Sequence, residues 1–386
     1  FAWWVIPVGI GNVLFMLFEN HMRGMFKNIL PVFLQDIGLR MVTTLLLIVF
    51  ALNYISFEVF LTALMVSNLL PAMVLMGYLV YHNELHYSLK HITIPRRFRK
   101  IIVSFSLFSY VNTLATMVVI TMDAVMIGGM IGLAATGIYT TMVQVTSAVL
   151  IPFRAMTRVS SPIVAKLWKE KDMKGLQAIY QKSSGAGLFI GLLSFLGLWL
   201  PVHELFSFLK PEFNAGIPVL FFLLLGRVVD MYCGLNGIIF ATSRKYKYDL
   251  LFTVFLCVGI YGLNRLLIPS YGIAGVGFST GFIFVFYNVA RSMYIFWAYR
   301  LNPFHWGHVK PLLVFLGVLV VYYIGVYFFP FSSESTTIYT VIRICCIEVL
   351  VFGGFVFPVL WFNLESETAA YVRSFVQAVK LKVLKL

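Results

Sequence analysis

The chain has 386 residues, of which 60% are hydrophobic and 11% are charged, and its mean hydropathy is +0.91. A soluble domain of this length could not keep so much apolar surface away from water, so the composition excludes a soluble protein and indicates a membrane protein. The formal net charge of +14 does not indicate a nucleic-acid partner, because the basic residues lie in short loops between apolar runs.

Apolar segments long enough to cross a bilayer follow one another along the sequence. A membrane-spanning helix needs about 20 mostly apolar residues, and helices are the default because lipid offers no partner for exposed backbone groups. The sequence therefore predicts an all-α polytopic membrane protein with eleven transmembrane helices. Their ranges are 2–18, 29–51, 57–81, 101–126, 133–157, 183–202, 214–241, 249–268, 272–297, 310–330 and 337–362.

Lysine and arginine are distributed unequally between alternate loops. The loops of one set are rich in them, as in Lys90, Arg96, Arg97, Arg99 and Lys100, or further on in Lys166, Lys169, Lys171 and Lys174. The loops of the opposite set hold only Lys210 and Arg265. Because basic loops stay in the cytoplasm, this pattern predicts that the first residue lies outside and the C-terminus lies inside.

The longest basic loop, 82–100, separates the first three predicted helices from the next six. We therefore expect a boundary between two lobes there. The predicted divisions of the chain are a three-helix segment over residues 1–82, a six-helix lobe over 101–298 and two additional helices in 309–362.

Two other segments combine apolar residues with many charges. Segment 160–182 is expected to form a short helix on the cytoplasmic surface. The tail 365–386 begins with glutamates, ends with lysines and repeats apolar residues at helical spacing. That pattern predicts an amphipathic helix at a membrane surface rich in anionic lipid, with a disordered basic tail as the alternative.

Two common sequence signatures of enzymes are absent. The chain contains no Gly-x-x-x-x-Gly-Lys phosphate loop and no His-Glu-x-x-His. Its four cysteines lie in apolar stretches and include no Cys-x-x-Cys pair. We therefore expect a protein that is not an enzyme, with no catalytic residue, bound metal or cofactor.

Ionisable residues inside the predicted helices are the most informative functional signal. A charge at mid-membrane costs about 2.5–3.5 kcal/mol on insertion scales, so it should face a partner or a watery cavity. Asp36 and Arg40 lie four residues apart in the second helix. Arg227 and Asp230 lie three residues apart in the seventh helix, and Glu348 lies in the middle of the last.

Two interpretations of these charges remain open. In one, each Asp–Arg pair neutralises itself within its own helix. In the other, Arg40 and Arg227 line a central cavity and bind an anionic headgroup, because guanidinium groups bind phosphate oxygens bidentately. Asp36, Asp230 and Glu348 are then the candidates that couple transport to a proton or a sodium ion.

Three further charges lie nearer to the ends of their helices. Asp123 is close to the outer end of the fourth predicted helix. Arg154 and Arg291 are close to the inner ends of theirs, from which a long side chain can reach the surface.

The segment around Asp123 resembles a known pattern. It reads Asp123-Ala-Val-Met-Ile-Gly-Gly-Met-Ile-Gly132 and continues with Ala134-Ala135-Thr136-Gly137-Ile138-Tyr139. An Asp near a helix end, a Gly-bearing turn and a Gly-x-Tyr that opens the next helix are similar to one branch of the multidrug/oligosaccharidyl-lipid/polysaccharide (MOP) flippase superfamily. That branch is the polysaccharide transporters, or O-antigen flippases. The motif singles out Asp123, Gly137 and Tyr139, for which a structural role is expected.

The resemblance implies two six-helix lobes around a central cavity, often followed by two more helices. In that arrangement 1–82 is a remnant of the N-terminal lobe that lacks its first three helices. The implied function is to move an undecaprenyl-pyrophosphate-linked oligosaccharide across a bacterial inner membrane by alternating access. The implied partners are this lipid-linked substrate, membrane lipids and polysaccharide-assembly proteins, with no nucleic acid.

Two other functions compete with the flippase. A cation-coupled drug or metabolite exporter of the same superfamily would bind its cation with unpaired carboxylates. A membrane glycosyltransferase or polysaccharide polymerase normally presents a large extramembrane loop with catalytic carboxylates. The longest loops here are about twenty residues long and basic, which disfavours the enzyme.

Overall fold

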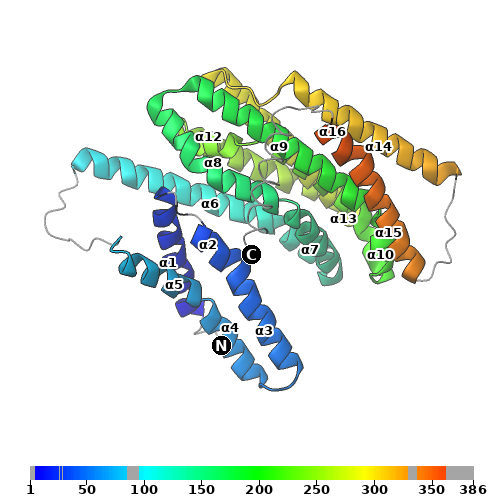
Figure 1. The fold of residues 1–386 in the computed structure, drawn as a ribbon, viewed down its shortest axis with the longest axis horizontal. Helices are drawn as coiled ribbons and strands as arrows, with labels where there is room; N and C mark the ends of the chain where they lie inside the picture. Colours follow the sequence, from blue (N-terminus) through cyan, green and yellow to red (C-terminus); the bar gives the residue numbers. More distant parts are fainter. Residues whose placement is uncertain (1–4, 26, 28, 85–94, 329–336, 362–386) are drawn as a thin grey trace. The chain divides into compact units, whose positions relative to one another are not determined.

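The computed structural model describes residues 5–25, 27, 29–84, 95–328 and 337–361. Helices joined by short turns make up these residues, and no strand occurs among them, which confirms the all-α prediction. The chain divides into two compact units, Phe1–Arg99 (unit 1) and Lys100–Leu386 (unit 2), and each is described by itself. Figure 1 shows the helices of both units.

Seven helical stretches of the described chain are long and apolar enough to cross a membrane, and an eighth is added if one bent pair of helices counts as a single span. This is the helix content of a multi-pass membrane protein. The count of eleven spans stays a prediction. The seven stretches are Phe57–Tyr81, Arg96–Met130, Met173–Trp199, Pro211–Tyr232, Lys247–Tyr299, Trp306–Phe328 and Thr337–Val359.

Unit 1 has a small core between its first and last helices. Helix α1 (Val5–Gly24) packs against α5 (Leu70–Tyr81), and α4 (Phe57–Ser67) contacts the preceding α3 (Leu39–Ala51). The core side chains are apolar residues of α1 and α5, namely Phe15, Phe18, Met22, Ala72, Leu75 and Leu79.

The predicted helix 29–51 contains a change of helix type. It runs from α2 (Ile29–Phe33) through the π-helical turn η2 (Leu34–Gly38) into α3. Single π-helical turns inside α-helices often mark functional positions. Asp36 belongs to this turn, one helical turn before Arg40.

Three helices form the centre of unit 2. They are α9 (Met173–Trp199), α11 (Ile217–Tyr232) and α13 (Lys247–Tyr299), and α11 contacts both of the others. Helix α6 (Arg96–Met130) lies against α13 through the buried side chains Val119, Leu256, Ile260 and Ile283.

Two Gly-x-x-x-Gly motifs, Gly187–Gly191 in α9 and Gly277–Gly281 in α13, let these central helices approach closely. A Cβ atom at Gly187 of α9 would lie 2.0 Å from the carbonyl oxygen of Met231 in α11. A Cβ atom at Gly281 of α13 would lie 2.4 Å from the carbonyl oxygen of Phe222. Lipid gives no hydrophobic drive for helix association, so close backbone packing at small residues supplies much of it.

Helix α13 is interrupted at Gly272. Its 53 residues would extend about 80 Å as one straight helix, far more than the hydrocarbon thickness of a bilayer. Gly272 has φ 57° and ψ −138°, outside the helical region, and separates the halves 247–271 and 273–299. The halves pack on each other, since a Cβ at Gly275 would lie 2.8 Å from the Leu267 carbonyl oxygen. They correspond to the predicted helices 249–268 and 272–297.

Two other predicted helices contain breaks. The segment 133–157 is divided between α7 (Leu133–Ala148) and α8 (Ile151–Glu170), which are bent by 52° relative to each other. In the segment 214–241, α11 ends at Tyr232 and a second helix, α12 (Asn236–Thr242), follows after Gly234, which has φ 64°.

The prediction of a separate surface helix over 160–182 is wrong. Helix α8 continues to Glu170, the chain turns at Lys171 and α9 begins at Met173. The side chain of Asp172 caps α9 by accepting a 2.9 Å hydrogen bond from the backbone N–H of Gly175. The charges of this segment therefore lie at the ends of two long helices.

Two of the remaining helices of unit 2 pack against α9. Contacts join α9 to α14 and α15, and α15 also contacts α10. The predicted amphipathic tail 365–386 lies outside the described residues. The bounds are α10 (Val202–Ser207), η3 (Pro211–Gly216), η4 (Trp306–His308), α14 (Val309–Phe328), α15 (Thr337–Val351), η5 (Phe352–Val356) and α16 (Phe357–Trp361).

Candidate functional site

Asp123 is the centre of a buried polar cluster in unit 2. Its carboxylate is contributed by α6, about two turns before the end of that helix, and the residue is 4% exposed. The partners come from α7 and from both halves of α13, so four helical segments meet at one carboxylate. The Asp123 cluster consists of Asp123, Tyr139, Asn264, Ser279 and Thr280.

Three donors satisfy the Asp123 carboxylate. The Tyr139 hydroxyl donates to Oδ2 at 2.5 Å, the Thr280 hydroxyl donates to Oδ2 at 2.8 Å, and the Asn264 amide donates to Oδ1 at 2.7 Å. The Ser279 hydroxyl in turn donates to Oδ1 of Asn264. An ionised carboxylate accepts about four hydrogen bonds, so this arrangement fits a negative charge. A proton or a small cation could replace one donor there.

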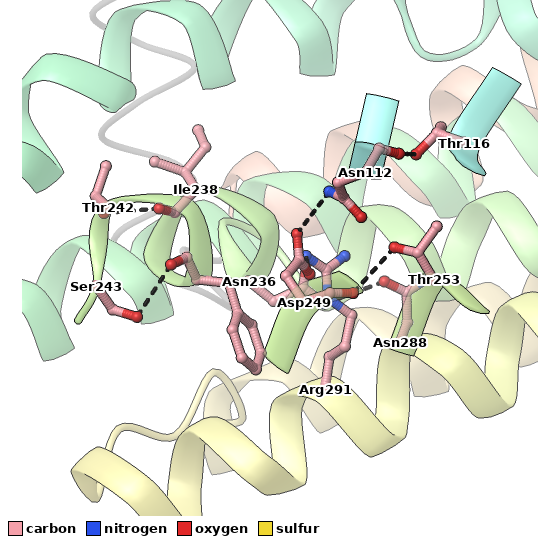
Figure 2. A network of polar contacts seen from close by, with 11 residues as sticks. Asn112, Thr116, Asn236, Ile238, Thr242, Ser243, Asp249, Thr253, Asn288 and Arg291 are labelled. Atoms are coloured by element: carbon pink, nitrogen blue, oxygen red, sulfur yellow. Dashed lines mark hydrogen bonds and ion pairs between the residues drawn. The ribbon is translucent and has the colours of Figure 1, made fainter. Parts of the chain in front are cut away.

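A second buried polar cluster surrounds Asp249, at the start of α13. Its carboxylate pairs with Arg291, from the second half of the same helix, with Nη2 and Oδ1 2.5 Å apart (Figure 2). The side chains of Asp249 and Arg291 are 12% and 8% exposed. From α6, Asn112 donates to the other carboxylate oxygen at 3.2 Å.

Arg291 also contacts aromatic rings and a helix break. Its guanidinium lies 4.8 Å from the ring centroid of Tyr287 and 5.4 Å from that of Phe240. On another side, Gly237 of α12 leaves room for it, since a Cβ there would lie 3.4 Å from Nη2. Nearby, the Asn236 amide donates to Oδ1 of Asn288 at 3.0 Å (Figure 2). Arg291 is thus buried, so the interpretation that it reaches the surface is wrong.

Arg227 is a half-buried cation of α11. Its guanidinium lies over the ring of Phe284 at 5.3 Å from the centroid. Within the described part of unit 2, no carboxylate oxygen lies within 4.0 Å of it, so Arg227 and Asp230 do not form the ion pair that one interpretation required. The charges of Asp230 and Arg154 both act on Arg227 from nearby. Among the described residues of unit 2, its guanidinium donors therefore have no carboxylate as hydrogen-bond partner.

Arg40, the cation predicted in unit 1, has an exposed side chain on α3. Its backbone carbonyl accepts a 2.9 Å hydrogen bond from the Thr43 hydroxyl. Arg40 and Arg227 belong to different units. A cavity lined by both therefore stays a prediction.

Glu348 does not form an ion pair with Arg343, the arginine of its own helix. Arg343, a turn and a half earlier, pairs instead with Glu204 of α10, whose side chain is 5% exposed. The Glu348 carboxylate is exposed and lies against Gly197 of α9, with both oxygens 3.5 Å from the position of a Cβ there.

Gly137 and Tyr139, which the resemblance singled out, differ in their surroundings. No atom lies within 4 Å of the position that a Cβ on Gly137 would take. Tyr139 is 2% exposed and binds Asp123. Tyr139 therefore belongs to the site, whereas Gly137 makes no close contact that requires glycine.

Sequence reasoning missed Asn264, Thr280 and the pairing of Asp249 with Arg291. The sequence contained a signal for the residues of α13. Asp249, Thr253, Leu256, Ile260 and Asn264 are buried and lie three or four residues apart, so polar and apolar residues share one face of the helix. Polar residues on the buried face of an apolar helix need hydrogen-bond partners. The depth of a residue in the membrane does not show which residues those partners are.

Among the residues that the structure describes, no group of three or more His, Cys, Asp or Glu side chains could hold a metal ion. The Asp123 cluster instead brings together several oxygen atoms that could act as ligands. They comprise one carboxylate, two aliphatic hydroxyls, a phenol and an amide, all of which are hard ligands.

No family model and no curated protein sequence matches this chain.

Proposed function

We propose that this protein is an ion-coupled flippase that moves an undecaprenyl-pyrophosphate-linked oligosaccharide from the cytoplasmic to the outer leaflet of a bacterial inner membrane. The observation that carries the proposal is the Asp123 cluster. A carboxylate shared by α6, α7 and both halves of α13 is costly in a membrane-spanning body, and such charges are typically retained for ion or substrate pathways.

Asp123 is a better candidate for ion coupling than Asp36, Asp230 or Glu348. A proton or cation that binds its carboxylate reduces the negative charge that accepts the hydrogen bonds joining four helical segments, and so weakens these bonds. Ion binding would therefore change how these segments pack, which is the property that coupling requires. The exposed carboxylate of Glu348 joins no such group of helices.

Arg227 supports an anionic substrate. Its guanidinium stacks on Phe284 but has no carboxylate partner within 4.0 Å in the described chain. Arg154, on α8, adds a second positive charge close by. A pyrophosphate group carries oxygens that a guanidinium binds bidentately, whereas a cationic drug would be repelled.

The proposal is tested by a flipping assay in proteoliposomes. The probe is a nitrobenzoxadiazole-labelled prenyl-diphosphate-linked N-acetylglucosamine, whose outer-leaflet fraction is bleached by dithionite. We expect Arg227→Gln to slow flipping by roughly tenfold or more, because a charged hydrogen bond contributes about 1.5–3 kcal/mol. Arg227→Lys should retain part of the rate, and Arg265→Gln, an exposed arginine outside the site, should retain all of it.

Asp123→Asn tests the coupling. We expect this variant to lose the acceleration that a proton or sodium gradient gives to the wild-type protein, while it still reconstitutes as folded protein. Equal flipping by wild-type protein, Arg227→Gln and protein-free vesicles would reject the flippase. A gradient response that survives in Asp123→Asn would remove Asp123 from the coupling.

One observation favours the drug exporter as second candidate. The carboxylate of Asp230 is half-buried and forms no ion pair with a cation of the described chain. An exporter predicts that ethidium efflux falls in Asp230→Asn, whereas the flippase predicts no ethidium efflux above that of cells without the protein.

A further inference from the structure

A groove of about 360 Å³ lies between the start of α9 and the end of α13. Met173, Lys174 and Gln181 line it from α9, and Tyr299, Arg300 and Leu301 line it from the other side. None of these residues belongs to the Asp123 cluster or the Asp249 cluster. We call it the α9–α13 groove.

Hydrogen bonds fix the walls of this groove. The Gln177 side chain donates to the Asn302 carbonyl at 2.7 Å and accepts from the Asn302 backbone N–H at 2.9 Å. This pair of bonds holds the chain that follows α13 against α9. Arg300 ends α13 with φ 60°, in the left-handed region, and Leu301 beside it is 2% exposed. The groove is therefore part of the packed structure.

The charge along the groove is positive. Lys174 and Arg300 line it, and none of its described lining residues carries a carboxylate. A third cation, Lys245, lies close to Tyr299, with its ammonium 5.7 Å from that ring centroid and 5.3 Å from that of Trp297. None of the three cations has a carboxylate within 4.0 Å in the part of the chain that the structure describes.

Part of the groove lining, on both sides, is apolar and aromatic, and we call this part the apolar wall. Met173 contributes exposed aliphatic surface from α9, and Tyr299, on the other side, packs edge-on against Trp168 at 4.8 Å between centroids. The adjacent Trp297 is 71% exposed. Exposed tryptophan beside basic residues at a helix end is typical of the membrane–water interface, and basic residues gather on the cytoplasmic side. The groove thus combines donors for an anion with surface for hydrocarbon, at the level of lipid headgroups.

We propose that the α9–α13 groove binds the headgroup of an anionic phospholipid. Lys174 and Arg300 donate to the phosphate oxygens, and the apolar wall takes the glycerol and the upper part of an acyl chain. A free phosphate metabolite would satisfy the cations equally well, but it would leave the apolar wall unused. The proposal does not depend on the transport function.

Thermal unfolding of the full chain in an uncharged detergent tests the proposal. We expect added phosphatidylglycerol to raise Tm by about 3 °C more than phosphatidylcholine does, because a ligand that binds only the folded state stabilises it. The double variant Lys174→Gln/Arg300→Asn should lose this difference. Asparagine is chosen at position 300 because it tolerates a positive φ.

The matched control is Lys169→Gln/Arg244→Gln, which removes two exposed cations outside the groove. It should keep the full response to phosphatidylglycerol. If the double groove variant does not fold, Lys174→Glu replaces it, since this side chain is exposed. A response that persists in the groove variant places the lipid elsewhere and overturns the proposal. An equal rise with glycerol 3-phosphate overturns it in favour of a soluble phosphate.

Discussion

At the scale of single residues, Asp249 and Arg291 show what a buried charge in unit 2 requires. Removing one member of a buried ion pair leaves the other uncompensated, at a cost of about 3–5 kcal/mol. We therefore expect Asp249→Asn and Arg291→Gln each to lower Tm strongly. The double variant Asp249→Asn/Arg291→Gln should recover much of the loss, because no charge is left unpaired. Thermal unfolding of the four proteins gives the coupling energy as a double-mutant cycle.

The control for this cycle is the surface pair Lys166–Glu170. Its side chains are 65% and 53% exposed and 3.8 Å apart, so Lys166→Gln should leave Tm almost unchanged. Additive losses in the double variant would show that Asp249 and Arg291 are not coupled.

At the scale of helices, the two Gly-x-x-x-Gly motifs set how closely α9, α11 and α13 pack. A methyl group at Gly281 would meet the backbone oxygen of Phe222, which cannot move aside as a flexible side chain can. We expect Gly281→Ala to force the helices apart and to destabilise the protein by about 1–3 kcal/mol. The measurement is Tm in detergent, together with the yield of monodisperse protein.

Gly262, in the first half of α13, provides the matched control. No atom lies within 4 Å of the position of a Cβ there. Gly262→Ala should therefore leave Tm unchanged, or raise it slightly through the higher helix propensity of alanine. If Gly281→Ala behaves in the same way as Gly262→Ala, close glycine packing does not hold α11 and α13 together.

The helices themselves could be predicted because hydropathy and helix length are local properties. The breaks within them were harder, since no hydropathy average reports the positive φ of Gly234 or the bend between α7 and α8. The pairing of Arg343 with Glu204 joins residues far apart in sequence, so only the folded chain reveals it. The same applies to the Asp123 cluster, in which the resemblance supplied Asp123 and Tyr139 but not the partners on α13.

At the scale of the whole molecule, the asymmetry of basic residues predicts which end of each helix lies in the cytoplasm. Helix α9 tests this directly. Its 27 residues extend about 40 Å, enough to cross a bilayer. Lys169 lies just before one end of α9 and Lys210 lies beyond the other, and both side chains are exposed. Positive charge therefore predicts Lys169 inside and Lys210 outside.

A cysteine placed at either position reports its side of the membrane. In a variant without the four native cysteines, Lys210→Cys should react with a membrane-impermeant maleimide on intact spheroplasts. Lys169→Cys should react only after permeabilisation. The opposite pattern would show that the protein has the inverted topology, with the α9–α13 groove at the outer surface. Reaction of both from outside would mean that α9 does not cross the membrane, because its two ends must then face the same compartment.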